Sequence, residues 1–271
     1  MSALSGKAFL AVTKLFHSVS GIHLNESKHA LVTGRLQKLA HEAGESDLDA
    51  YVERLVQGNA PAAEMTRVID RLTTNETYFF REPQHFNDLA ERLGAHANSS
   101  NSSKDEFRVW SAASSSGEEA YSVAMLMTDV LESKPWQVIG TDLSSAMVDS
   151  ARKALYALDR ARMVPPDYLR RFCLKGQGPH EGQVLVTKAV RERVRFQTAN
   201  LMLDLPQLPQ FDVIFLRNVL IYFDNDAKSQ IVRRVLTQLK PGGVLYTGHA
   251  ESLSTLNLPV RALATAIHVH A

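Results

Sequence analysis

Apolar residues recur at helical spacing through about the first 70 positions of the chain. Val32, Leu36 and Leu39 lie three or four residues apart, and the same spacing resumes over residues 48–55. Side chains spaced in this way share one face of a helix. We therefore predict a separate, all-helical N-terminal domain over residues 1–70.

A different pattern follows, in which short apolar runs typical of strands alternate with amphipathic helical stretches. A helix over 83–96 and a polar loop over 98–103 come first. The predicted strands cover 107–111, 136–141, 194–198, 211–216 and 243–247, and the predicted helices cover 118–131, 144–155 and 227–239. This alternation favours an α/β fold with a doubly wound, mostly parallel sheet that binds its ligand at the carboxyl ends of the strands.

One segment interrupts the alternation. A glycine-rich turn, Gly176–Gly182, separates two short apolar runs at 172–174 and 184–187, and such a pattern predicts an antiparallel hairpin. The expected organisation is thus a linker of helices over 71–97, followed by an α/β domain over 98–271 with a small antiparallel β subdomain inserted at about 172–192.

Composition narrows the classes of function. A net charge of +1 argues against a globally basic nucleic-acid binder. Lys7 and Lys14 interrupt the apolar residues of the N-terminus, and no run approaches the ~18 apolar residues of a membrane span. We expect a cytoplasmic monomer that neither binds nucleic acid nor inserts into a membrane.

The cysteine and histidine pattern gives no indication of a metal. Cys173 is the only cysteine, which excludes an intrachain disulfide and disfavours a zinc cluster. The ten histidines show no metal-ligand spacing. His268 and His270 alternate on a predicted terminal strand, and we expect both to face solvent.

Three basic residues, Lys28, Arg35 and Lys38, share one face of the second predicted helix, opposite its apolar stripe. Such a face is either simply solvated or a docking surface for an acidic partner.

The run Thr73–Pro83, with sequence TTNETYFFREP, joins the helical region to the α/β region. It could form a capped junction helix that buries Phe79 and Phe80. Alternatively, its asparagine, threonine and arginine side chains could hold a polar ligand against the aromatic residues.

The first predicted strand leads into a loop of small residues, Ser111–Gly117, followed by Glu118 and Glu119. The loop lacks the glycine spacing of a dinucleotide-binding fingerprint and the Gly-Lys-Ser/Thr of a phosphate loop. The two glutamates favour the helix dipole, and they would repel a pyrophosphate but tolerate an ammonium or sulfonium group. The second strand ends at Asp142, where a carboxylate can bind a ribose diol. These features favour S-adenosylmethionine over a nicotinamide dinucleotide.

The fourth predicted strand leads into Arg217, Asn218 and Tyr222, which leave the sheet where the reactive end of a cofactor would lie. A tight turn, Lys240–Gly243, then enters the next strand, as is common before the fifth strand of methyltransferases.

With these stretches the chain resembles the CheR family of chemotaxis receptor methyltransferases over nearly its whole length. The resemblance rests on TTNETYFFREPQHF, VWSAASSSGEEAYSVAM, GTDLSSAMVDSARKALY, FDVIFLRNVLIYFD and LKPGGVLYTGHAES. It implies a Rossmann-like, class I S-adenosylmethionine-dependent methyltransferase. The cofactor-binding residues that it implies are Asn75, Thr77, Arg81, Glu118, Asp142, Asn200, Leu201, Arg217 and Asn218. Glu118 would meet the amino-acid part of the cofactor, with Glu119 as the alternative, and Asp142 the ribose.

The resemblance also implies an activity and partners. The enzyme would transfer methyl groups to glutamate side chains of chemoreceptors, giving methyl esters and S-adenosylhomocysteine, without a metal. Arg81 and Tyr222 are the candidates for orienting the accepting carboxylate. The partner would be the cytoplasmic helical bundle of a receptor, and the β insert would be a site for a receptor's C-terminal peptide. The alternatives are a methyltransferase with another substrate and a non-catalytic signalling scaffold.

Overall fold

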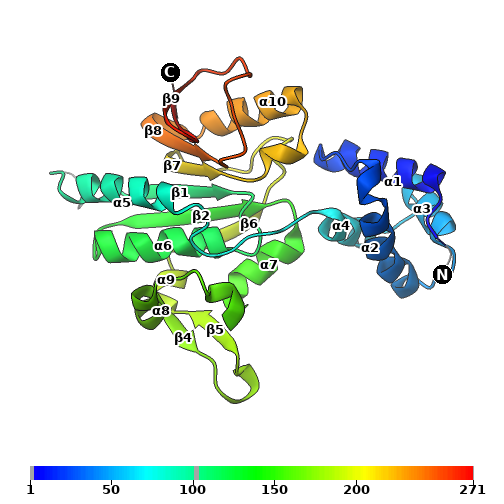
Figure 1. Cartoon of the computed structure of the whole chain (residues 1–271), viewed down its shortest axis with the longest axis horizontal. Coiled ribbons are helices and arrows are strands. Elements are labelled where there is room, and N and C mark those ends of the chain that lie inside the picture. The colour runs from blue at the N-terminus through cyan, green and yellow to red at the C-terminus, as the bar shows by residue number, and fades with distance from the viewer. Residues whose placement is uncertain (1–2, 101–103, 271) are drawn as a thin grey trace.

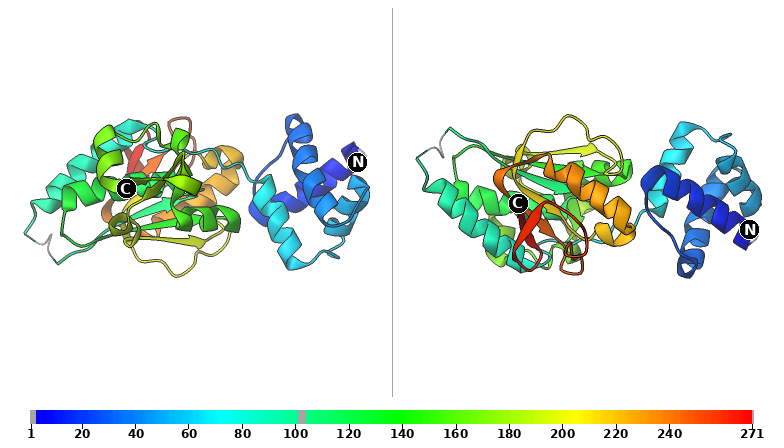
Figure 2. Two further views of the ribbon diagram at one scale, coloured as in Figure 1. Left: turned by 90° about the horizontal axis from the view of Figure 1, so that it is seen from below. Right: turned by 90° about the horizontal axis from the view of Figure 1, so that it is seen from above.

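The computed structural model describes residues 3–100 and 104–270, so that part of the polar loop predicted over 98–103 lies outside the described residues. A helical domain lies at one end of the molecule, and the chain crosses from it to a larger α/β domain through a single extended linker (Figures 1 and 2). No helix of the described ranges has both the length and the apolar character needed to cross a membrane.

The N-terminal domain packs its helices around a core of its own, as predicted. Its helices are α1 (Gly6–Ser20), the 3₁₀ helix η1 (Glu26–Lys28), α2 (His29–Glu42), α3 (Leu48–Val56) and α4 (Ala62–Leu72). Leu36, Tyr51 and Leu72 are completely buried in this core. The helical spacing read along the sequence therefore corresponds to the buried stripe of each helix.

The larger domain is built on a seven-stranded sheet in the order β6-β2-β1-β7-β8-β10-β9. Its strands are β1 (Phe107–Ala112), β2 (Trp136–Asp142), β6 (Val194–Thr198), β7 (Phe211–Leu216), β8 (Leu239–Thr247), β9 (Val260–Ala264) and β10 (Ile267–His270). The first five strands in that order run parallel, and β10 is antiparallel to both of its neighbours. The predicted fold class is confirmed.

Helices cover both faces of the sheet. The helices of this domain are α5 (Pro83–Ala97), α6 (Glu118–Leu131), α7 (Ser145–Lys153), α8 (Pro166–Phe172), α9 (Lys188–Arg191) and α10 (Asn225–Leu236). Along β1, Val109 belongs to the core under α5 and α6, and Trp110 belongs to the core under α10. This alternation follows from the two-residue period of a strand.

A second, three-stranded antiparallel sheet, ordered β3-β5-β4, forms the insert. It contains β3 (Leu155–Ala157), β4 (Cys173–Lys175) and β5 (Gln183–Val186). The predicted hairpin corresponds to β4 and β5, whereas β3 was not anticipated. Short 3₁₀ helices, η2 (Leu158–Ala161) and η3 (Gly178–His180), lie in its connections.

Within the range 71–97 predicted as a linker of helices, α5 is a helix, but the segment 73–82 that joins the two domains, here called the linker, is not. Between the end of α4 and the start of α5, residues 74–78 have no regular structure, and residues 79–80 form a turn. The junction-helix interpretation is therefore wrong. Phe79 is nevertheless buried, packed edge-on against Tyr156 of the insert, so this aromatic residue anchors an extended segment.

The expected exposure of His268 is also wrong, because its side chain is buried. β10 lies between β8 and β9, so His268 belongs to an internal strand, and its Nε2 lies 3.4 Å from Oγ1 of Thr247. Burial lowers the pKa of His268. His270, at the end of the strand, is exposed as expected.

Candidate active site

A cavity of about 210 Å³ opens at the carboxyl ends of β1, β2 and β7. These ends supply the loop after β1, Asp142 and Arg217. The opposite wall comes from the N-terminal domain, through Ser20, Ile22 and Leu24. The cavity therefore spans both domains, and the linker passes along it.

The structure brings nearly all of the sequence-predicted site residues to this cavity. Those that line it are Asn75, Thr77, Arg81, Asp142, Asn200, Leu201, Arg217, Asn218 and Tyr222. Glu119 also lines the cavity. Glu118 is completely buried and instead contacts Ser116 and Arg160.

Asp142 is held in place by the backbone of two loops. Its Oδ2 accepts from Ser115 N at 2.7 Å, and its Oδ1 accepts from Ser144 N at 2.9 Å. Burial raises the pKa of Asp142 to about 6, although these hydrogen bonds oppose the shift. Each carboxylate oxygen can accept a second hydrogen bond, so Asp142 can still bind a pair of ligand hydroxyl groups.

The two glutamates that begin α6 have different surroundings. Gly117 precedes them with φ +94°, and a Cβ there would lie 2.9 Å from that of Ala151, so only glycine fits this turn. Glu119 accepts from Ser111 Oγ at 2.7 Å and lies 3.0 Å from Arg217. Burial raises the pKa values of both Glu118 and Glu119.

Arg217 lies between two carboxylates in the wall of the cavity. Its side chain is 1% exposed, with Nη2 3.0 Å from Oε2 of Glu82 and Nη1 3.0 Å from Oε2 of Glu119. It also donates to the carbonyl oxygen of Arg81. Burial acts to raise the pKa of Glu82, but Arg217, Asn218 and the His249 N–H offset that effect and leave this pKa lowered.

A buried carboxylate shapes the loop that carries Tyr222. Oε2 of Glu251 accepts from Asn218 N and Gly248 N, each at 2.7 Å, and Oε1 accepts from Ile221 N at 3.2 Å. Burial raises the pKa of Tyr222. Its hydroxyl therefore stays protonated at neutral pH and can donate a hydrogen bond into the cavity.

Strained backbone surrounds the cavity. Left-handed φ angles occur in the linker, in the loop after β1 and after β7, at Phe80, Glu82, Ala113, Ser115 and Asn218. Non-glycine residues in this region cost of order 1–3 kcal/mol each, and they persist where the surrounding contacts fix them. Such residues concentrate at functional sites.

The linker residues are held by contacts within the linker and with the loop after β1. Arg81 donates from Nη1 to Glu76 O at 3.2 Å, and its guanidinium carbon lies 5.5 Å from the centroid of the Tyr78 ring. The carbonyl of Asn75 accepts from Ser115 Oγ at 3.2 Å. Arg81 is only half-buried, so part of its side chain stays accessible to a ligand.

Asn200 links the two domains as well as lining the cavity. Its Nδ2 donates to Val19 O at 2.7 Å, and its Oδ1 accepts from Met202 N at 2.9 Å. The side-chain amide thus uses both its nitrogen and its oxygen in hydrogen bonds within the protein. Leu201, beside it, supplies an apolar part of the wall.

The three basic residues predicted on the second helix do not share one element, because Lys28 ends η1 whereas Arg35 and Lys38 lie on α2. Lys28 and Lys38 are exposed. Arg35 is half-buried and donates from Nη1 to the carbonyl oxygens of Leu72 and Thr73, at 3.1 and 2.9 Å. Arg35 therefore supports the start of the linker, a role that the sequence did not indicate.

Sequence reasoning missed Glu82 and Glu251, which position Arg217 and Asn218. Both glutamates lie in stretches that carry the family resemblance, within FFREPQ and GHAES. The resemblance therefore marked their surroundings but assigned them no role. Sequence reasoning also missed the contribution of Ile22 and Leu24 to the cavity.

Family models match both domains of the chain. The model described as "CheR methyltransferase, all-alpha domain" matches residues 7–73, and the one described as "CheR methyltransferase, SAM binding domain" matches residues 75–268. The chain belongs to the CheR methyltransferase family. Like that family, it is an S-adenosylmethionine-dependent methyltransferase.

Curated relatives agree with this assignment. The chain is 39% identical over 257 residues to the "Chemotaxis protein methyltransferase" of Salmonella typhimurium, which covers 94% of this chain and 86% of the relative. It is 38% identical to the protein of the same description from Escherichia coli, covering 94% and 87%. It is 33% identical to "Chemotaxis protein methyltransferase 2" of Pseudomonas aeruginosa, covering 96% and 91%.

Proposed function

We propose that this CheR-family enzyme methylates glutamate side chains of chemoreceptors in the cytoplasm, acting as a monomer. One structural observation supports the proposal above others. The cavity is closed on one side by the N-terminal domain and crossed by the linker that carries Arg81. A helical domain beside the reacting groups suits a large protein substrate. The curated relatives are described as chemotaxis protein methyltransferases.

The donor groups of the cavity suit S-adenosylmethionine. Asp142 offers two carboxylate oxygens to the ribose hydroxyls, and the assignment to Asp142 follows from its place at the end of β2. Glu119, which lines the cavity, would face the ammonium group of the amino-acid part. We assign this contact to Glu119, because Glu118 is buried and pairs with Arg160, whose side chain reaches it from the surface. Asn75, Thr77, Leu201 and Asn218 would enclose the rest.

When bound, S-adenosylmethionine supplies a methyl group activated by its sulfonium. The accepting glutamate is ionised at neutral pH, with a reference pKa of about 4.3, so the protein need not provide a general base. Its residues instead align the carboxylate and exclude water. We infer that Arg81 and Tyr222 orient that carboxylate, because both line the cavity and the guanidinium is only half-buried.

Cofactor affinity is expected to fall as pH falls through about 6, the pKa of Asp142 in the free protein. The ionised carboxylate accepts the ribose hydrogen bonds, and protonation competes with them. For one such group the affinity should fall roughly tenfold between pH 7 and pH 5, as measured by calorimetry. Asp142→Asn should bind weakly and lose this dependence. If the variant keeps the same pH profile, Asp142 does not contact the ribose.

Lys28 at the end of η1 and Lys38 on α2 are the basic residues that can dock an acidic receptor bundle, because Arg35 is engaged with the linker. Reversing both lysines to glutamate should slow methylation of intact receptor, and more so at low salt, because exposed charges are screened within about 10 Å at 0.1 M salt. Reversal of Lys7 and Lys14 on α1 is the matched control. Equal rates for the two variants at every salt concentration would mean that Lys28 and Lys38 are only solvated.

The β insert is a candidate site for a C-terminal receptor peptide. Within the described residues β4 pairs only with β5, and Leu174 on this strand is exposed. An edge strand with free backbone groups can accept an extended peptide as an added strand. Shortening the loop 176–182 should raise KM for receptors with such a tail and leave tailless receptors unaffected, because tethering only raises effective concentration. An equal rise for both receptor types would exclude tethering.

The decisive experiment is transfer of labelled methyl from S-adenosylmethionine to membranes that contain chemoreceptors. The label should be lost on treatment with base, because a glutamate methyl ester hydrolyses whereas an N-methyl or ribose methyl does not. Base-stable label would indicate a methyltransferase with another substrate. Cofactor binding without any transfer would indicate a signalling scaffold of the same fold.

A further inference from the structure

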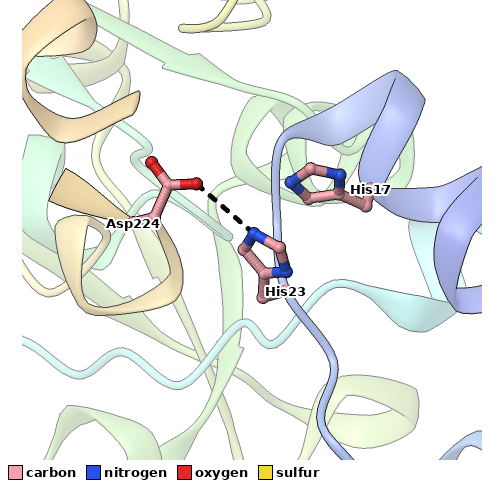
Figure 3. A group of neighbouring side chains, drawn as sticks. All are labelled: His17, His23 and Asp224. Carbon is pink, nitrogen blue, oxygen red and sulfur yellow. Dashed lines mark ion pairs between the residues drawn. The ribbon is translucent and has the colours of Figure 1, made fainter. Parts of the chain in front are cut away.

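His17, His23 and Asp224 come together where the N-terminal domain meets the start of α10 (Figure 3). One ligand atom from each lies within 4.8 Å of the other two. The two imidazole centroids are 3.9 Å apart, and Nε2 of His23 lies 3.5 Å from Oδ2 of Asp224. The sequence pattern gave no indication of this group, because about 200 residues separate Asp224 from the histidines.

The backbone fixes this arrangement. Gly21 ends α1 with φ +73°, and its N–H donates to His17 O at 2.7 Å, which turns the chain so that the His23 ring lies against that of His17. A Cβ at position 21 would lie 2.6 Å from Cγ of Met202, so the turn sits directly against the methyltransferase domain. His23 N also donates to Tyr222 O at 3.1 Å.

Asp224 has one carboxylate oxygen in use and one directed at the histidines. Oδ1 accepts from Ala227 N at 2.8 Å and so caps α10. Oδ2 is the atom nearest to His23. The helix cap therefore holds the carboxylate in position while leaving an oxygen for a further ligand.

We propose that His17, His23 and Asp224 form a zinc site that ties the N-terminal domain to α10. Two imidazoles and one carboxylate are a ligand set that suits Zn²⁺. In a tetrahedral site with bonds of about 2.1 Å, neighbouring ligand atoms lie about 3.4 Å apart. The 3.5 Å between His23 Nε2 and Asp224 Oδ2 is close to this spacing. A nitrogen of His17 lies within 4.8 Å of both atoms and would move closer when the metal binds. A water molecule would take the fourth position.

Such a site would act on the structure of the cavity and not on the methyl transfer, which needs no metal. His17 and His23 belong to the same segment as Ser20, Ile22 and Leu24, which line the cavity wall, and Tyr222 lies two residues before Asp224. The zinc would therefore hold the Tyr222 loop against the opposite wall of the cavity.

Metal binding by the full chain, with any affinity tag removed and after dialysis against EDTA, tests the proposal. Calorimetry with Zn²⁺ should show one ion per chain, and Co²⁺ should give the strong visible absorption of a four-coordinate site. His17→Gln, His23→Gln and Asp224→Asn should each weaken Zn²⁺ binding by more than the 10- to 100-fold typical of losing an outer-shell partner. Asparagine caps a helix about as well as aspartate, so Asp224→Asn removes the ligand and keeps the cap. His41→Gln, on the exposed end of α2, is the control.

Hydrogen exchange shows whether bound metal joins the domains. Zn²⁺ should slow exchange over residues 17–24 and 220–227 in the unaltered protein, and not in His23→Gln. Failure to bind Zn²⁺ stoichiometrically would overturn the proposal. The proposal would also be overturned if the three site variants bound Zn²⁺ as tightly as the control variant His41→Gln. Neither outcome bears on methylation of receptors.

Discussion

Arg217→Met is expected to destabilise the methyltransferase domain by about 3 to 5 kcal/mol, the cost of removing one partner from a buried ion pair. Arg217 is 1% exposed and lies between Glu82 and Glu119. Without the guanidinium, both carboxylates, whose side chains are only 14% and 15% exposed, lose this cationic partner. The linker carbonyl of Arg81 also loses a donor. Cofactor binding should be lost as well, because the cavity floor depends on this network.

Urea unfolding followed by tryptophan fluorescence measures the stability of the methyltransferase domain. The chain's two tryptophans, Trp110 and Trp136, are both buried in that domain. Arg195→Met, at an exposed arginine on β6, should change stability by no more than about 0.5 kcal/mol. Adding Glu119→Gln to Arg217→Met should recover part of the loss. A loss no greater than that of Arg195→Met would show that the carboxylates find other partners.

Arg81→Ala is expected to reduce turnover roughly 10²-fold, the scale of a small misplacement of reacting groups, with a smaller change in KM for the receptor. The guanidinium lines the cavity from the linker and donates a hydrogen bond to Glu76 O. Arg81→Lys should recover little, because an ammonium group lacks the planar fork that orients a carboxylate. Tyr222→Phe should show a smaller loss of the same kind.

Steady-state kinetics with saturating S-adenosylmethionine separates the two possible roles of Arg81. Arg195→Ala, at an exposed arginine outside the cavity lining, should have normal kinetics. Normal turnover with a raised KM for receptor would make Arg81 a binding residue and remove it from the alignment step.

The alternation of apolar residues was sufficient to predict the architecture. Val109 and Trp110 face different cores as a strand requires, and α6 occupies the predicted range 118–131. These features depend on local periodicity and on burial, which a sequence displays directly. Asp142 and Arg217 could be placed at the cavity for the same reason, because the ends of parallel strands meet at one edge of a sheet.

Local pattern failed where neighbours in space define the structure. β3 has only three residues and exists because it pairs with β5. His268 alternates like a surface residue, yet β10 is an internal strand. The linker has the composition of a capped helix, but Phe79 and Ser115 hold it extended across the cavity.

By itself, the sequence determined the two domains, the parallel sheet and the residues at the strand ends, because each depends on spacing along the chain. Only the tertiary structure decided that Glu119 lines the cavity while Glu118 pairs with Arg160, since one residue along a helix turns a side chain by about 100°. The tertiary structure alone also decided that Arg35 donates a hydrogen bond to the linker and that Asp224 lies beside His23. Those contacts join residues far apart in sequence, and the packing of the two domains against each other sets them.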